Sequence, residues 1–170
     1  MRPFQAYEVP FLGLKEGFHH FEFEVNDTFF SHFEFSQIEA AEIKVGMTLE
    51  KQSTMMILEF DLNGSVKSLC DRCGAPMDLE IEHQDRVIVK FGDETEMTED
   101  EILVLGPAEH ILHLEQYLYE FAHLGLPSKV AHEDEEDCDQ DALDKLSEWE
   151  IGEDDDEEND PRWDALKGLK

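Results

Sequence analysis

Two cysteines with metal-ligand spacing are the part of this sequence best suited to chemistry. Cys70 and Cys73 are separated by two residues, and Gly74 follows them directly. Thiolates at this spacing can bind one metal ion, and glycine lets the backbone turn with a positive φ. The pattern is typical of a zinc knuckle in a turn between two strands.

A structural zinc ion needs four protein ligands, so one C-x-x-C motif supplies half of a site. The remaining candidates are His132 and Cys138, the only further cysteine, which lie together after Pro127. We therefore predict a closed site with one structural zinc and no open position for catalysis. Its four ligands would be Cys70, Cys73, His132 and Cys138.

Two other interpretations of the cysteine pair stay open. A thioredoxin-type redox pair sits at the start of a helix in a βαβ unit, whereas this pair falls in a predicted β turn. The two cysteines could also be reduced thiols with no metal. The chain has no nucleophile elbow, zinc-protease motif or glycine-rich phosphate loop. We predict a protein that is not an enzyme and has no small-molecule substrate.

The elements that position the cysteines are predicted to be long strands. Apolar and polar residues alternate along segments 42–50, 55–70 and 77–91, which is the period of a half-buried strand. Short turns between them predict an antiparallel meander that forms a twisted sheet or an open barrel. Asn63-Gly64 interrupts the second segment, and we interpret it as a β-bulge.

One helix is predicted after the sheet, and it would cover a face of the sheet that is otherwise exposed. It is indicated by apolar residues at helical spacing, at Ile111, Leu114, Leu118 and Phe121, and it would end at Gly125 and Pro127. The expected fold class is α+β, mainly antiparallel β, with residues 1–130 as a β-rich domain.

The remainder of the chain is dominated by acidic residues. From Glu133 to Asp160 there are seventeen Asp or Glu and a single Lys, and the whole chain has a net charge of −30. We predict that residues 131–159 form a flexible acidic segment. Residues 160–170 should form a short amphipathic helix that docks on this domain or on a partner. Its candidate partner-binding residues are Asp160, Pro161, Arg162, Trp163 and Leu166.

The charge favours a basic partner over a nucleic acid, and the alternative is that it serves only to keep the protein soluble. Binding to phosphates requires Lys and Arg, and no patch of them is visible. Ribosomal proteins are a large basic class. The alternative is direct RNA binding through the sheet, with Tyr7, Phe18 or Phe35 stacking on bases. No apolar stretch is long enough to span a membrane, and the first residues do not form a signal peptide, so we expect a cytoplasmic protein.

Three motifs together resemble one bacterial family. They are Cys-Asp-Arg-Cys at 70–73, Leu-Gly-Leu-Pro at 124–127 and Asp-Pro-Arg-Trp-Asp-Ala-Leu-Lys at 160–167. In this order they resemble the YceD family, the large ribosomal RNA subunit accumulation proteins, over nearly the whole chain. His132 and Cys138 resemble a His and Cys pair found in one version of the family. Many members carry a second cysteine cluster near the C-terminus, whereas here Cys138 stands alone.

The resemblance implies a cytoplasmic protein needed for normal levels of large-subunit ribosomal RNA, with suggested metal and nucleic-acid binding and no catalytic activity. We expect a non-enzymatic accessory factor in large-subunit biogenesis that engages a basic ribosomal protein or a precursor particle. The alternative is a metal-binding protein that contacts RNA directly through its β-sheet.

Overall fold

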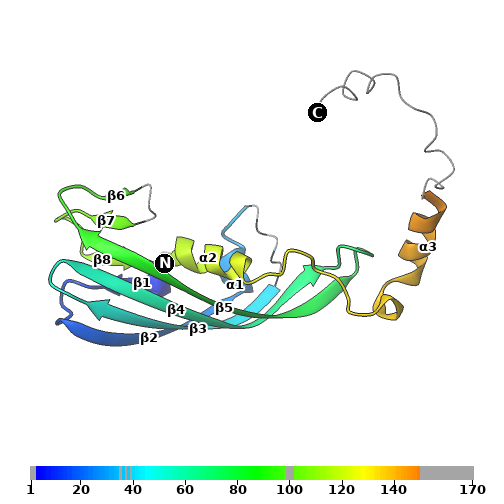
Figure 1. Cartoon of the computed structure of the whole chain (residues 1–170), viewed down its shortest axis with the longest axis horizontal. Coiled ribbons are helices and arrows are strands. Elements are labelled where there is room, and N and C mark those ends of the chain that lie inside the picture. The colour runs from blue at the N-terminus through cyan, green and yellow to red at the C-terminus, as the bar shows by residue number, and fades with distance from the viewer. Residues whose placement is uncertain (1–2, 35, 37, 39, 99–101, 150–170) are drawn as a thin grey trace, which may run out of the picture.

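The computed structural model describes residues 3–34, 36, 38, 40–98 and 102–149, and its order of elements is dominated by strands (Figure 1). The strands are β1 (Glu8–Pro10), β2 (Gly17–Asn26), β3 (Ala40–Lys51), β4 (Met55–Leu69), β5 (Pro76–Phe91), β6 (Glu96–Met97), β7 (Leu103–Leu105) and β8 (Ile111–His113). The α-helices are α1 (Asp27–Phe30), α2 (Glu115–Leu124) and α3 (Gln140–Trp149), and the 3-10 helices are η1 (Gln5–Tyr7) and η2 (Glu135–Asp137).

Six strands form one open sheet in the order β2-β3-β4-β5-β7-β6. All neighbours are antiparallel except β5 and β7, which are parallel. A separate two-stranded ribbon pairs β1 with β8. The predicted α+β class with a mainly antiparallel, unclosed sheet is confirmed.

The long strands follow the alternation in the sequence. In β3 the side chains of Ile43, Val45 and Met47 are buried, and the residues between them are exposed. In β4 the same pattern buries Leu58 and Leu62. Since successive side chains of a strand point to opposite faces, one face of the sheet carries the apolar core.

The predicted β-bulge at Asn63-Gly64 is wrong. The pairing of β4 with both neighbours runs through Gly64 without a break, to Ile43 on one side and Ile81 on the other. A Cβ at Gly64 would lie 2.6 Å from the Cα of Ile43 and even closer to the backbone oxygen of Glu42. The glycine is therefore explained by a close approach between two backbones.

Helix α2 packs on the buried face of the sheet, as predicted. The ring of Phe121 meets Phe60 of β4 edge to face, with 5.2 Å between ring centroids. The helix begins later than predicted, because Ile111 belongs to β8 and pairs with Pro10. Within the described part of the chain, no helix is long and apolar enough to cross a membrane.

The acidic segment 131–159 contains two helical elements, η2 and α3, where we expected none. The carboxylate of Asp139 accepts hydrogen bonds from the N–H groups of Asp141 and Ala142, which caps α3. This local cap explains the helical backbone in a polar sequence. The flexibility of the whole segment stays a prediction, and the helix expected at 160–170 lies outside the described residues.

Candidate metal centre

The C-x-x-C motif forms the tip of the hairpin between β4 and β5. The N–H of Gly74 donates to the carbonyl of Cys70 at 2.7 Å, and the N–H of Cys70 donates to Ala75 at 2.8 Å. Gly74 has a φ of 74°, the left-handed conformation that glycine adopts most easily. The motif therefore lies in a tight turn between antiparallel strands, which is not the helix-start setting of a thioredoxin pair.

Asp71 brings a distant part of the chain to this turn. Its backbone N–H donates to the carbonyl of Val130 at 2.6 Å, and its carboxylate accepts the Val130 N–H at 2.7 Å. These two bonds fix the chain just after α2 beside the hairpin tip. They place His132 next to the cysteines.

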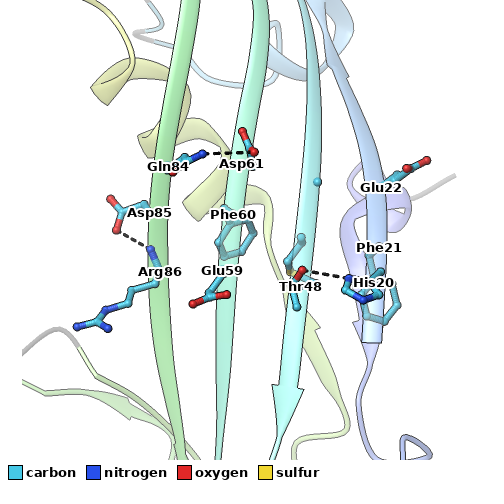
Figure 2. Close-up of a pocket in the computed structure, with 12 residues that line it drawn as sticks. His20, Phe21, Glu22, Thr48, Glu59, Phe60, Asp61, Gln84, Asp85 and Arg86 are labelled. Atoms are coloured by element: carbon cyan, nitrogen blue, oxygen red, sulfur yellow. Dashed lines mark hydrogen bonds between the residues drawn. The ribbon is translucent and has the colours of Figure 1, made fainter. Parts of the chain in front are cut away.

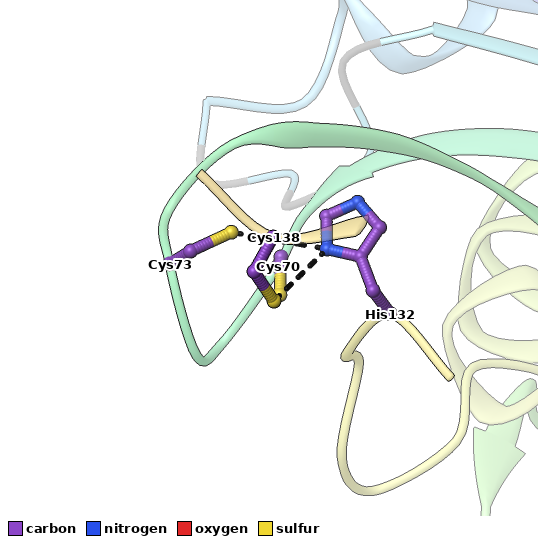
Figure 3. Close-up of side chains that lie close together, drawn as sticks. All are labelled: Cys70, Cys73, His132 and Cys138. Atoms are coloured by element: carbon purple, nitrogen blue, oxygen red, sulfur yellow. Dashed lines mark hydrogen bonds between the residues drawn. The ribbon is translucent and has the colours of Figure 1, made fainter. Parts of the chain in front are cut away.

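Four side chains meet at this point (Figure 3). The ligand atoms of Cys70, Cys73, His132 and Cys138 all lie within 4.8 Å of one another. The Nδ1 atom of His132 is 3.8 Å from the sulfur of Cys73 and 3.5 Å from the sulfur of Cys138. Cys70 and Cys138 are buried, and the other two are half-buried. The structure thus brings the four predicted ligands together.

Two of the distances between donor atoms suit a tetrahedral metal ion. With Zn–S bonds of about 2.3 Å and Zn–N bonds of about 2.0 Å, neighbouring ligand atoms of a tetrahedron are roughly 3.5–3.8 Å apart. The two distances from His132 Nδ1 fall in this range. All four positions of such a tetrahedron would be filled by protein, which is typical of a structural site.

Arg72 lies against the outer side of the cluster. Its Nη1 atom is 3.7 Å from the sulfur of Cys138, and its Nε atom is 3.9 Å from a carboxylate oxygen of Glu135. The Cys138 sulfur is the main reason that the pKa of Arg72 is raised. A guanidinium beside the Cys138 sulfur offsets the negative charge that accumulates when the thiols of the cluster ionise.

Hydrogen bonds favour the thiolate at one cysteine. Burial alone would raise the pKa of Cys70, but backbone N–H groups of His132, Cys73 and Arg72 donate to its sulfur and lower the pKa to about 6. At Cys138 burial has the larger effect, and the pKa is raised. The cluster therefore provides one thiolate ready to bind a cation near neutral pH.

Sequence reasoning missed Asp71 and Arg72, the two residues between the cysteines. Asp71 is a residue type that often bonds to backbone, and Arg72 is a cation next to two thiols. Their partners, Val130 and Cys138, lie about sixty residues further along the chain, so the sequence alone could not identify them. The five candidate partner-binding residues lie outside the described residues. They are Asp160, Pro161, Arg162, Trp163 and Leu166.

Of the three aromatic residues considered for RNA stacking, the structure describes Tyr7 and Phe18. Tyr7 is buried, and its hydroxyl donates to the carbonyl of Glu24 at 2.8 Å. Phe18 is 67% exposed on the edge strand β2. Phe35 lies outside the described residues. Stacking by Tyr7 is thus excluded by its burial.

The fold and the cluster define a class of protein: an acidic, sheet-based protein with a thiol-rich centre at one hairpin tip. A family model described as "Large ribosomal RNA subunit accumulation protein YceD" matches residues 58–170, more than half of the chain. The chain therefore belongs to the YceD family. The match includes most of β4, all of β5 and all four residues of the cluster. Searches of curated proteins and of solved structures gave no match.

Proposed function

We propose that this protein is a non-enzymatic accessory factor in assembly of the large ribosomal subunit. It supports accumulation of large-subunit ribosomal RNA by engaging a basic ribosomal protein or a precursor particle, in the cytoplasm. Membership of the YceD family carries this proposal, because the family description names a role in large-subunit RNA accumulation. The net charge of −30 supports a basic partner.

We propose that the cluster at the hairpin tip holds one structural zinc. The supporting observation is the set of three thiols and one imidazole with ligand atoms inside 4.8 Å. Zinc would link the β4–β5 turn to the chain after α2 without adding a reactive position. In this role the metal fixes the start of the acidic segment.

We further propose a division of labour along the chain. Residues 1–130 form the folded domain, residues 131–159 act as an anionic arm, and residues 160–170 bind a partner. Asp160, Pro161 and Arg162 would begin the last helix, and Trp163 and Leu166 would supply its apolar contacts. A tethered anionic arm can attract a basic protein before that protein binds RNA.

Affinity capture of the full chain from cell extract tests this function. Ribosomal proteins or large-subunit precursors should be enriched at low salt and reduced at about 0.5 M salt, since screening weakens contacts between exposed charges. A matched variant with residues 153–158 changed to their amides should capture less. If neither wild-type sample enriched ribosomal components, the proposal would be wrong.

A further inference from the structure

The core-free face of the sheet carries no helix over β2, β3, β4 and β5 in the part of the chain that the structure describes. The apolar core, α1 and α2 lie on the other side (Figure 1). On the uncovered face the pairing register places side chains in rows across four strands. We name this uncovered surface the open face. Its central rows are His20, Thr48, Glu59 and Arg86, then Glu22, Gly46, Asp61 and Gln84, then Glu24, Lys44, Asn63 and Glu82.

Acidic side chains outnumber basic ones on the open face. Over the four strands its carboxylates are Glu22, Glu24, Glu42, Glu50, Glu59, Asp61, Asp78, Glu80 and Glu82. Its cations are Lys44, Lys67, Arg86 and Lys90. One end is partly apolar: Phe18 is 67% exposed and shares a row with Ile57 and Ile88, with Glu50 between Phe18 and Ile57. The chemistry of this face fits a segment that is basic and partly apolar.

Gly46 stands at the centre of the open face, and the fold of the chain does not account for it. Its φ is not in the left-handed region, and a Cβ placed there would meet no atom within 4 Å. Glycine inside a strand weakens the strand. Its backbone gains more entropy on unfolding than that of other residues, and it has no side chain to pack against neighbours. By contrast, Gly64 is required by the approach of β3. Glycine inside a strand often marks a place where something outside the strand comes close.

The two register neighbours of Gly46 are both acidic. Glu22 lies beside it on β2 and Asp61 on β4. Strands are about 4.8 Å apart, so these two residues are separated by roughly 10 Å across the glycine. Side chains of Asn63 and Gln84 donate to the Asp61 carboxylate at 2.6 and 3.4 Å and hold it in place. The missing side chain therefore leaves a gap between two carboxylates.

This gap is part of a hollow of about 830 Å³ on the open face (Figure 2). Glu59, Asp61 and Arg86 line it from β4 and β5, and His20 and Glu22 line it from β2. An arginine or lysine side chain lying over Gly46 would lie beside Asp61, and the exposed side chain of Glu22, which points away from β3 in Figure 2, would turn to reach it. Ionised hydrogen bonds of this kind are among the stronger ones available at a protein surface.

We infer that the open face is a docking site for an extended basic segment of a large-subunit ribosomal protein, with one arginine or lysine seated over Gly46 between Glu22 and Asp61. This inference rests on the proposed function and names the surface that would perform it. An extended segment presents every second side chain to the same side, so it can place cations along the face. The carboxylates would repel the phosphates of RNA.

Binding of individually purified large-subunit ribosomal proteins to the full chain tests the inference. Gly46→Val fills the gap without changing charge, and Ser65→Val is its control on the same face outside the hollow. Glu22→Gln with Asp61→Asn removes the two flanking charges, and Asp93→Asn with Glu94→Gln removes two exposed charges from the loop after β5, away from the open face. We expect the first variant of each pair to bind at least tenfold more weakly, and each control to stay within twofold of wild type.

Gly46→Val should also raise the melting temperature, by about 2–4 °C, because valine suits a strand better than glycine. A fall in melting temperature would show that the glycine serves the fold, and the inference would be overturned. It would also be overturned if wild type bound a ribosomal protein and all four variants bound equally. The proposed function would survive that result. If wild type bound no purified ribosomal protein, the inference would be overturned, and the proposed function would fail as well only if capture from cell extract also enriched no precursor particle.

Two further arms identify other occupants. A large-subunit RNA fragment is tested with wild type and Gly46→Val, and light scattering measures the mass of both. Loss of RNA binding in the variant would assign the face to RNA. Loss of a dimer in the variant would assign it to a second copy of the chain. Either result would overturn the inference.

Discussion

The two ends of the β4–β5 hairpin are held by different forces. At one end Met56 pairs with Val89, and both are fully buried in the apolar core. At the other end Leu69 pairs with Pro76, and Leu69 is 51% exposed. The cluster of three thiols and one imidazole lies just beyond this exposed end. Hydrophobic burial stabilises most of the sheet, whereas at the tip the proposed zinc ion would supply a local crosslink.

The largest effect should follow removal of the thiols. Cys70→Ser with Cys73→Ser should reduce zinc from one ion per chain to none, and the tip should lose its link to His132 and Cys138. In isolated zinc-finger peptides such a metal contributes about 10–16 kcal/mol. Elemental analysis gives the stoichiometry, and hydrogen exchange should increase at 70–75 and 128–138 while the core strands stay protected.

Cys73→His is the matched control, since histidine keeps a metal ligand at that position. It should retain part of the zinc. If wild-type protein purified without chelator contained no zinc, the metal assignment would be wrong, and the interpretation as reduced thiols would stand.

A core substitution should act on the buried part of the hairpin, away from the tip. Leu62 is fully buried, and Leu62→Ala should reduce the free energy of unfolding by about 2–5 kcal/mol. Denaturant titration measures this loss. Leu69→Ala on the same strand is the control and should change stability by less than about 0.5 kcal/mol. Zinc content should stay at one per chain in both; loss of zinc from folded Leu62→Ala would show that the two ends are not independent.

Asp71 should have a smaller effect, confined to the tip. Asp71→Ala removes the carboxylate that accepts the Val130 N–H, and it should weaken zinc binding about 10–100-fold. Competition with a zinc-binding dye measures the affinity. Asp78→Ala changes an exposed carboxylate on β5 and should leave the affinity unchanged. Equal affinities in all three proteins would remove Asp71 from the account.

The smallest effect should be seen with pH in metal-free protein. The pKa of Cys70 is about 6 in the fold, below the ordinary value of about 8.5 for a free thiol. The stabilising effect of this thiolate is fully present above about pH 8.5 and is lost as pH falls through about 6. Ultraviolet absorbance should show one thiolate forming near pH 6, and Cys70→Ser should lack it. A first thiolate near pH 8.5 would contradict the hydrogen-bonded arrangement.

The long strands could be predicted because the residues of each strand alternate between apolar and polar, and this alternation shows which side of the strand is buried. Ile43, Val45 and Met47 alternate with polar residues, and that pattern is local. The approach of β3 to Gly64 and the pairing of Ile111 with β1 depend on distant parts of the chain, and the sequence reasoning mistook both. Helix α3 could not be predicted, because its capping residue, Asp139, is one of many acidic residues in that segment.

The sequence was enough to predict which residues form the candidate site, but not how they are arranged or what supports them. Counting ligands was enough to select His132 and Cys138, because Cys138 is the only cysteine outside the motif and His132 lies six residues before it. The roles of Asp71 and Arg72 needed the fold, since both act on the chain near residues 130–138. Gly46 also needed the fold, because only the register shows which carboxylates flank it.

The ratio of large-subunit to small-subunit ribosomal RNA in cells that lack this gene tests the central claim most directly. The account predicts that the ratio falls on deletion and that wild-type protein restores it, whereas Cys70→Ser with Cys73→Ser does not at the same protein level. An unchanged ratio after deletion, or full restoration by the double variant, would contradict it.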